Sequence, residues 1–468
     1  MTNTKTSNAP VAENKMGTMP VPKLLVSMSL PMMISMLVQA LYNIVDSMFV
    51  AQISEEALTA VSLAFPIQTL MIAVASGTGV GINALLSRNL GEKDFTGANN
   101  AARNGLFLGI VSCIIFAILG GIGSHSFFAI QTDNPDIVNY GTQYMTIITI
   151  CSAGIFLQIT FERLLQSTGK TIYNMITQGT GAIINIILDP IMIFGLFGFP
   201  RLEVVGAAVA TITGQTVAVC LSFFFNLTKN KDVQLTFKSI KLESYYFKGI
   251  CTVGIPTIIM QSMSSVMCFG INKLLLDFST TSTAVFGAYF KLQTFVYMAI
   301  FGLNNAVIPI VAFNIGAKHA ERIKKVIRLS GAYSALIGLV GLIIMEMLPV
   351  QLISAFAPSE EMFSLGVTAL RILGLSFVFG GISVMTCYAL QGFSRGIASL
   401  LISALRQVII LLPLASIMGK MMGINGIWWS FLTSETVTVA FAIIYLGIAE
   451  KKELAFLASI PLEQSIAE

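Results

Sequence analysis

Long apolar runs separated by short polar turns fill this chain from residue 24 to residue 449. A helix that crosses a bilayer needs about 20 apolar residues, and these runs reach that length. Strands of a transmembrane β-barrel would instead alternate over about 10 residues. The pattern therefore predicts an all-α polytopic membrane protein. The twelve expected spans are residues 24–50, 57–87, 104–127, 138–161, 172–196, 204–227, 248–276, 282–313, 329–350, 364–390, 398–419 and 424–449.

The composition supports this interpretation and excludes the soluble classes. Of the 468 residues, 55% are apolar and only 11% are charged, whereas an ordinary soluble protein is about 25% charged. The six cysteines stand in apolar stretches without a CxxC pair, and the two histidines are far apart. Neither a zinc site nor a disulfide framework is therefore expected. We expect a lipid bilayer around the protein, no cofactor, no nucleic-acid partner and a monomer.

The basic residues predict the orientation. With both termini in the cytoplasm, 21 of the 27 basic residues, Arg163 among them, fall in segments on the cytoplasmic side. The outside loops then hold only Arg201 and Lys420. Basic residues are retained on the cytoplasmic side during insertion. We therefore expect a multi-pass protein of the cell (plasma or inner) membrane with both ends inside.

An internal repeat relates the two halves of the chain. A shared N-x-G-x-K loop at a constant offset is difficult to obtain by chance, even in so apolar a sequence. The matches at a shift of 225 residues include Pro31 with Pro256, Asn89–Lys93 with Asn314–Lys318, Arg103 with Arg328, and Leu165-Gln166 with Leu390-Gln391.

Each half holds six expected spans, so both halves begin on the same side of the membrane. Parallel repeats of this kind are related by a pseudo-two-fold axis along the membrane normal, and they are typical of secondary transporters. The expected division is a cytoplasmic tail (1–23), an N-lobe (24–227), a cytoplasmic connecting loop (228–247), a C-lobe (248–449) and a second cytoplasmic tail (450–468).

Polar side chains inside the spans of the first half are the candidates for function. Gln39, Tyr42, Asn43 and Asp46 stand at i, i+3, i+4 and i+7, on one face of the first span. Asn185 and Asp189 share a face of the fifth span, and Pro190 follows directly and loosens that helix. A carboxylate near the bilayer centre costs about 2.5–3.5 kcal/mol and normally faces a bundle interior or a water-filled cavity.

The repeat provides a control for these acids. At the offset of 225, Asp46 corresponds to Ile271 and Asp189 to Leu414. Packing alone therefore does not require carboxylates at these positions. One alternative is that each Asp is wetted at a helix end or caps a neighbour. The other is a shared, partly desolvated pair, in which burial and mutual repulsion would favour proton binding near neutral pH.

Other features of the spans have simpler explanations. Lys291 and Arg371 in the second half are expected to reach an interface or to pair with Glu346, Asp277 or Glu435. The glycines of 77–81 lack the Lys of a phosphate loop, and we expect close helix packing there. The pair Trp428-Trp429 is expected to anchor a helix at the membrane interface.

Three stretches resemble the MATE multidrug exporters: SLPMMISMLVQALYNIVDSMFV, the two N-x-G-x-K loops, and IINIILDPIMIFG followed by VVGAAVAT. The resemblance covers residues 24–449 and is strongest to the prokaryotic branch of DinF- and MepA-type proteins. It implies that Asp46, Asn185 and Asp189 form a cation-coupling site for H⁺ or Na⁺. Gln39, Tyr42 and Asn43 would line the lobe, and Pro31 would bend the first span. The tenth span has no acid, unlike the branch with a sodium site in the C-lobe.

These observations favour a cation-coupled antiporter over the other functions considered. Its expected substrates are small amphipathic, often cationic, organic compounds and drugs, and its coupling ion is H⁺ or Na⁺. The alternative is an exporter or flippase of a lipid-linked or other metabolite on the same scaffold. A membrane-embedded enzyme would need a nucleophile with a base, or a metal set, inside the spans, and two scattered histidines do not supply one.

Overall fold

The computed structural model describes residues 14–234, 243–356 and 358–459. Within these ranges the chain forms helices joined by short turns, without a strand. Residues 1–13 of the expected first tail, 235–242 of the connecting loop and 460–468 of the second tail lie outside the described residues. The helices of the first half are α1 (Lys15–Thr18), α2 (Val21–Ala51), α3 (Glu55–Gly91), α4 (Phe95–Gln131), α5 (Pro135–Ile150), α6 (Ala153–Ser167), α7 (Thr171–Phe194), the 3₁₀ turn η1 (Leu196–Gly198) and α8 (Glu203–Lys229).

The second half repeats this order of helices. It comprises α9 (Ser244–Leu276), α10 (Thr280–Gly316), α11 (Ala320–Met347), α12 (Pro349–Ser354), α13 (Glu360–Gly374), α14 (Ser376–Gly392), α15 (Gly396–Ala404), the π-turn η2 (Leu405–Ile409), α16 (Leu411–Met422) and α17 (Ile424–Ser459). The repeat extends to the caps, because Ser54 accepts the N–H of Ala57 at the start of α3, and Ser279 accepts that of Ser282 at the start of α10.

Within the described residues, the twelve expected spans correspond to ten single helices and two bent pairs of helices. Ten helices are long and apolar enough to cross a bilayer by themselves. The fourth span is a bent pair, α5 with α6 at 41°, and the tenth is a second bent pair, α13 with α14 at 45°. Both bends fall at matching places in the two halves, so they belong to the repeated architecture.

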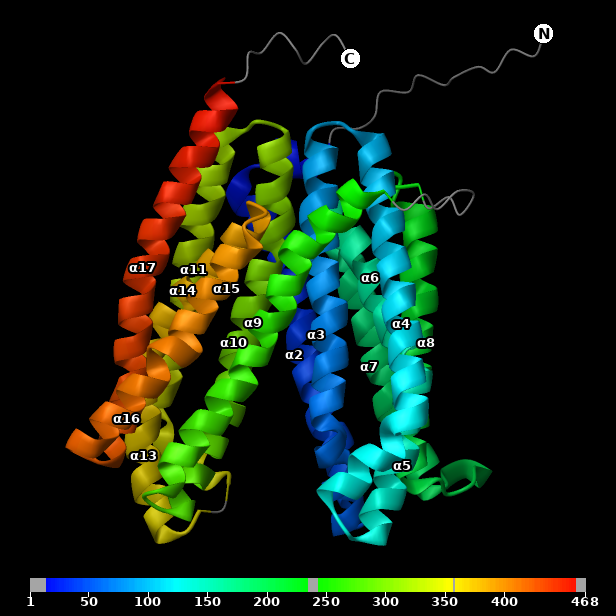
Figure 1. Ribbon diagram of the computed structural model, residues 1–468, viewed down its shortest axis with the longest axis vertical. Coiled ribbons are helices and arrows are strands. Elements are labelled where there is room, and N and C mark those ends of the chain that lie inside the picture. Colours follow the sequence, from blue (N-terminus) through cyan, green and yellow to red (C-terminus); the bar gives the residue numbers. More distant parts are fainter. Residues whose placement is uncertain (1–13, 235–242, 357, 460–468) are drawn as a thin grey trace.

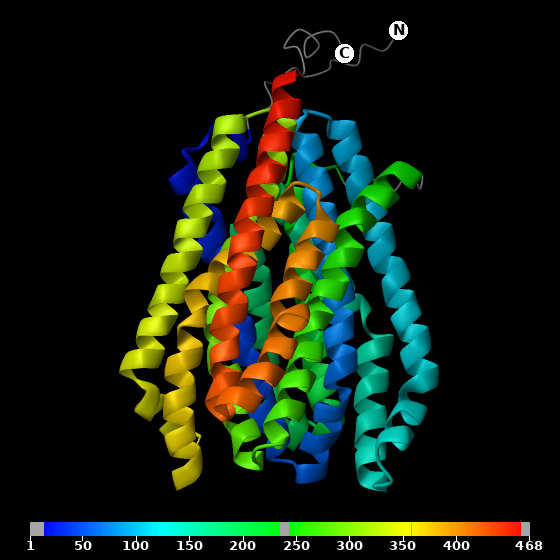
Figure 2. The same ribbon diagram turned by 60° about the vertical axis from the view of Figure 1, so that its left-hand side comes forward.

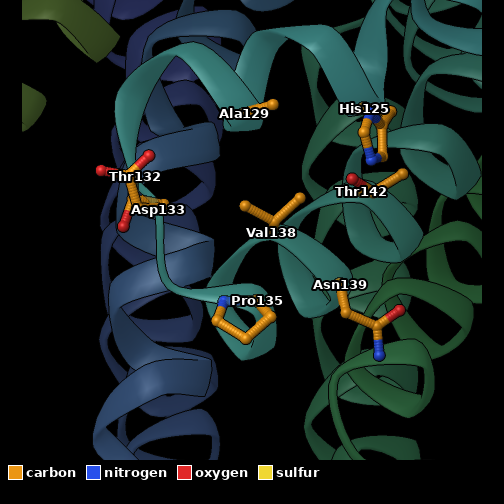
Figure 3. Close-up of a pocket in the computed structure, with 8 residues that line it drawn as sticks. All are labelled: His125, Ala129, Thr132, Asp133, Pro135, Val138, Asn139 and Thr142. Atoms are coloured by element: carbon orange, nitrogen blue, oxygen red, sulfur yellow. The ribbon is translucent and has the colours of Figure 1, made fainter.

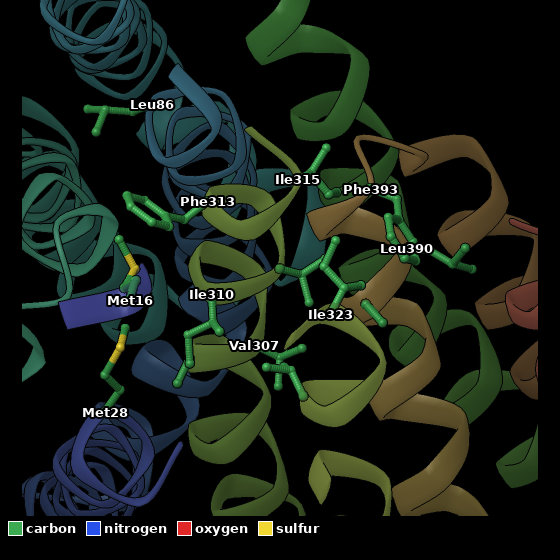
Figure 4. Close-up of a cluster of buried hydrophobic side chains, with 14 of the residues drawn as sticks. Met16, Met28, Leu86, Val307, Ile310, Phe313, Ile315, Ile323, Leu390 and Phe393 are labelled. Carbon is green, nitrogen blue, oxygen red and sulfur yellow. The ribbon is translucent and has the colours of Figure 1, made fainter. Parts of the chain in front are cut away.

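The helices form two bundles, α2–α8 and α9–α17, whose ribbons lie side by side near the end that holds both termini and diverge toward the other end (Figures 1 and 2). Contact between the bundles is made chiefly by α3 with α9 and by α2 and α3 with α10. A core shared by both bundles lies at this end, where Met28 and Leu86 of the first approach Ile310 and Phe313 of the second (Figure 4).

Glycines allow the two bundles to touch backbone to backbone. A side chain at Gly91 would run into the carbonyl of Phe313, and one at Gly316 would run into the carbonyl of Arg88. The expected role of the glycines at 77–81 in close packing is likewise observed, since a Cβ on Gly77 would lie 2.9 Å from the carbonyl oxygen of Gly254. This end of the molecule is therefore closed by the main chain itself.

Candidate functional site

The two carboxylates predicted from the sequence meet inside the first bundle. Asp46 extends from α2 and Asp189 from α7, and these helices pack along each other. Their carboxyl groups lie close enough to influence each other electrostatically. Asp189 is completely buried, and within the described residues neither acid forms an ion pair. The site thus brings together two acids that no basic side chain in the described part of the chain neutralises by an ion pair.

Asn185 and Thr211 complete the inner side of this pair. Asn185 stands one turn before Asp189 on α7, and its amide nitrogen lies 3.3 Å from Asp189 Oδ1. If the amide is turned over, the nitrogen donates to Asp189 Oδ2 at 3.2 Å and the oxygen accepts from the Thr211 hydroxyl at 3.2 Å. Thr211, on α8, therefore orients the amide that holds Asp189.

Two tyrosines and a glutamine enclose the pair from the other side. Tyr42 of α2 and Tyr144 of α5 both lie close enough to interact electrostatically with Asp46 and Asp189. Gln68 of α3 donates to the Tyr144 hydroxyl at 2.6 Å. Oδ1 of Asp46 is buried and makes no hydrogen bond to the described residues. A buried acceptor left unpaired costs about 1–3 kcal/mol, and a proton or a cation bound there would remove that cost.

The remaining predicted residues lie around this cluster with different exposures. Gln39 and Tyr42 are half-buried on α2, whereas the Asn43 side chain is exposed. Pro31 is buried within α2, which continues without a break from Val21 to Ala51. Pro190 lies within α7, four residues before the helix ends at Phe194. The structure thus brings Tyr42, rather than Asn43, to the carboxyl pair.

A second polar network, which the sequence analysis missed, lies at the end of α6. Glu162 is buried and accepts hydrogen bonds from Gln158 at 3.0 Å, Thr177 at 3.0 Å and Gln178 at 2.7 Å. Arg163, expected in a segment on the cytoplasmic side, lies within α6, which extends to Ser167, and it is buried at 7% exposure.

Arg163 instead reaches the second bundle. Its Nη1 donates to the side-chain oxygen of Asn305 on α10 at 3.0 Å, and Nε2 of Gln166 donates to the Asn305 carbonyl at 2.5 Å. These hydrogen bonds join α6 to α10 across the boundary between the bundles. They add a polar contact to the glycine contacts that close this end.

The second bundle holds a different charged group, also missed from the sequence. Arg406, in the π-turn η2, pairs with Glu435 of α17 at 2.9 Å, and its guanidinium lies 5.4 Å from the centre of the Tyr297 ring. Of the partners expected for Arg371, the structure shows Glu346, which lies 3.8 Å away in an exposed pair, and not Glu435. One expectation is corrected here, because Trp428 is fully buried rather than an interfacial anchor.

A surface hollow of about 430 Å³ lies between α4 and α5, at the end away from the termini (Figure 3). Its lining includes His125, Asp133 and Asn139. None of the residues of the carboxyl pair contributes to it. The polar cluster inside the first bundle is therefore the better candidate for function.

Two parallel helix bundles, one of them carrying Asp46 and Asp189 without an ion pair to any described residue, define a membrane transporter built from repeated halves. The family model MatE matches residues 31–191 and again residues 256–417. Together these matches cover more than half of the chain, so the chain belongs to the MatE family. The two matches begin 225 residues apart, at Pro31 and Pro256, which is the offset of the internal repeat.

Curated relatives match nearly the whole chain. The multidrug export protein MepA of Staphylococcus haemolyticus is 27% identical over 422 residues, which cover 90% of this chain and 92% of that protein. MepA of Staphylococcus aureus is 27% identical over 431 residues, covering 91% and 94%. A protein of Shewanella oneidensis named as an FAD transporter is 27% identical over 415 residues, covering 87% and 90%.

Solved structures share the fold. One, described as the outward-facing conformation of a multidrug resistance MATE family transporter, superposes with a TM-score of 0.89, covers 96% of this chain and 99% of its own, and is 24% identical. A MATE structure in complex with MaL6 gives a TM-score of 0.88 at 24% identity, covering 95% and 99%. The expected twin-lobe helical architecture is confirmed.

Proposed function

We propose that this protein is a proton-coupled antiporter that exports small amphipathic, often cationic, organic compounds across the cell membrane. The observation that supports this most directly is the pair formed by the half-buried Asp46 and the buried Asp189, for which the described residues supply no ion-pair partner. A buried negative site of this kind attracts a cation, and a proton and a cationic drug are alternative ways to neutralise it.

The coupling follows from competition at one site. When Asp46 or Asp189 takes up a proton, the site loses the charge that holds a cationic compound, and the compound leaves. When the proton dissociates on the other side of the membrane, the charge returns and the next compound binds. Exchange requires only that the two ligands favour different states of the protein. Asn185 positions Asp189, and Gln39, Tyr42 and Asn43 line the route on α2.

Alternating access would be a movement of the N-lobe (24–227) against the C-lobe (248–449). We infer that both termini are cytoplasmic, because most basic residues then lie on that side. The contacts that close the termini end would in that case seal the cytoplasmic side, and the site would face outward. Pro31 and Pro190 are places within α2 and α7 where the missing backbone hydrogen bond permits bending. We propose that the monomer is the transporting unit.

The substrate class is supported by the relatives that are named multidrug export proteins. The relative named as an FAD transporter makes export of a metabolite the second candidate. FAD is anionic, and the two unneutralised acids in the first bundle would repel it. We therefore favour cationic and neutral amphipathic compounds as substrates.

The experiment uses purified protein in proteoliposomes with a fluorescent lipophilic cation as the test compound. We expect counter-transport when a pH gradient is imposed and none with a sodium gradient alone. Asp46→Asn and Asp189→Asn should each reduce this transport at least about 100-fold, because an amide can neither bind nor release the proton. Asp133→Asn, which changes an acid outside the cluster near the far end of α4, is the matched control and should transport normally.

Each alternative has its own outcome in this experiment. Transport driven by a sodium gradient alone would show that the coupling ion at this oxygen-rich site is Na⁺ rather than H⁺. Transport of FAD but not of the cation would support the metabolite exporter. Full activity in both Asn variants would contradict the assignment of the site.

A further inference from the structure

A short segment before the first membrane helix crosses between the two bundles. This segment, residues 14–19, is called the strap here, and it contains the single helical turn α1. Asn14 caps the turn by accepting the N–H of Met16 at 3.0 Å. Pro20 separates the strap from α2, which begins at Val21. Since proline cannot donate a backbone hydrogen bond, the strap and α2 are not one continuous helix.

Side chains of the second bundle donate hydrogen bonds to carbonyl groups of the strap. Nη2 of Arg322 donates to the carbonyl of Met16 at 2.9 Å and to that of Met19 at 2.8 Å. Nδ2 of Asn314 donates to the Met16 carbonyl at 3.2 Å. Nε of Arg322 in turn donates to Oδ1 of Asn314 at 3.1 Å, which fixes the guanidinium in place. Hydrogen bonds from a charged donor are the stronger kind.

The first bundle holds the strap more weakly. Nδ2 of Asn14 donates to the Thr168 carbonyl at a longer distance of 3.3 Å. The Lys15 side chain passes close to Gly169 and feels the positive charge of Lys170. Partial burial and this neighbouring charge lower the pKa of Lys15. Like charges at this contact oppose it.

Between these contacts, side chains of the strap fill the space between the two bundles. The Met16 side chain is completely buried in the core that both bundles share, close to Phe313 and Met28 (Figure 4). Gly17 lies against the Phe313 ring, where a Cβ would be 3.1 Å from Cε1. The strap is therefore packed into the contact between the bundles rather than laid over it.

We propose that the strap is a latch, closed by Arg322 and Asn314, that holds the termini end of the transporter shut. The proposal rests on the alternating access proposed above, in which the bundles part at this end. The strap is covalently joined to α2 of the first bundle, so separation must break its bonds to the second. Pro20 provides the joint at which the strap swings free without unwinding α2.

The test measures how often this end opens. Ala84 is 1% exposed and packs against Val253 and Ile308 of the other bundle. In a background with the six native cysteines replaced, Ala84→Cys is labelled with a membrane-impermeant maleimide in nanodiscs, where both faces are accessible. We expect Arg322→Ala to raise the labelling rate roughly tenfold, since two charge-assisted hydrogen bonds are lost.

Matched variants separate the latch from a general loss of stability. Deletion of residues 2–19, which removes the strap, should raise the rate as Arg322→Ala does, whereas deletion of residues 2–13 should leave it unchanged. Met16→Ala should raise it through lost burial alone and does not alter the second bundle. Arg322→Lys, which keeps the charge without the planar fork, should give an intermediate rate.

The outcomes are distinct from those for the proposed function. Unchanged or slower labelling in both Met16→Ala and the longer deletion would overturn the latch, whatever Arg322→Ala does. Labelling does not depend on which compound is carried. A parent protein that opens faster without its strap but transports no cation would therefore support the latch while contradicting the antiporter.

Discussion

The two bundles share one architecture but differ in whether the acids inside them are paired with a base. In the first, Asp46 and Asp189 lie together, and no basic side chain of the described residues forms an ion pair with either. In the second, Arg406 and Glu435 form a pair at 2.9 Å. The positions are not interchangeable, because the offset of 225 relates Asp189 to Leu414 and Arg406 to Gly181. The repeat supplies the scaffold, and each half has acquired its own polar interior.

This difference assigns different physical roles to the two halves. A neutral ion pair has no net charge with which to attract a cation, whereas two adjacent acids do. The π-turn is also tied to α17 through its main chain, since Ser434 donates to the Arg406 carbonyl at 2.9 Å. We therefore expect the first bundle to respond to ions and the second to provide stability.

The largest expected effect is on the stability of the second bundle. Arg406→Gln should lower the free energy of unfolding by about 3–5 kcal/mol, because Glu435 is left buried without its partner. The double variant Arg406→Gln, Glu435→Gln should recover most of that loss, since no uncompensated charge remains. Thermal unfolding in detergent measures both. A single variant as stable as the wild type would show that the pair is not a structural element.

The next effect concerns Asn185 in the first bundle. Asn185→Ala removes the amide that donates to the Asp189 carboxylate, a hydrogen bond to a charged group of about 1.5–3 kcal/mol. Asp189 then binds a proton more readily. Half-maximal proton-driven transport should therefore occur at a proton concentration lower by roughly tenfold or more, that is, at a higher pH. The pH dependence of transport in proteoliposomes measures the shift. A move toward higher proton concentration would contradict this role for Asn185.

Thr211→Val should give a smaller shift in the same direction. The change keeps the shape of the side chain and removes the hydroxyl that lies 3.2 Å from the Asn185 amide. A neutral hydrogen bond contributes about 0.5–1.5 kcal/mol, so the shift should be roughly threefold to tenfold. Thr436→Val, at the matching position of the second bundle, is the control and should leave the pH dependence unchanged.

The smallest effect is on the stability of the first bundle. Asp189→Asn should leave the free energy of unfolding unchanged or raise it by up to about 1 kcal/mol, because repulsion between the two acids is relieved. The same variant should lose transport, so the substitution would abolish function without lowering stability. Unfolding of Asp189→Asn at a clearly lower temperature would indicate that the pair is structural, as its counterpart Arg406 with Glu435 is.

Much of the fold could be predicted from the sequence because the relevant signals are local. Apolar runs and turns define the spans, and the N-x-G-x-K loops at Asn89–Lys93 and Asn314–Lys318 reveal the repeat. Asp46, Asn185 and Asp189 stand out because a polar side chain inside an apolar span is rare. The bends within the fourth and tenth spans were not predicted, since their two segments read as one apolar run.

The parts that could not be predicted depend on which helices become neighbours. Tyr144 and Gln68 join the carboxyl pair only through the packing of α5 and α3, and Arg406 meets Glu435 only through that of η2 and α17. The burial of Arg163 and its contact with Asn305 were not predicted, because a basic residue just beyond a span resembles a loop residue. Nothing in the spacing of these residues distinguishes a partner inside the bundle from a contact with solvent.

Gly91 and Gly316 lie where the two bundles cross, and their contacts are reciprocal. Gly91 packs on the carbonyl of Phe313 and Gly316 on that of Arg88, and both partners are also related by the offset of 225. This reciprocity is the geometry of an isologous interface, in which a surface meets its own copy. The crossing therefore has, within one chain, the reciprocal geometry of a homodimer contact. A side chain at either glycine would displace the main chain of the other half. The residues at this contact are therefore constrained in both halves, whereas the polar residues inside the two bundles differ.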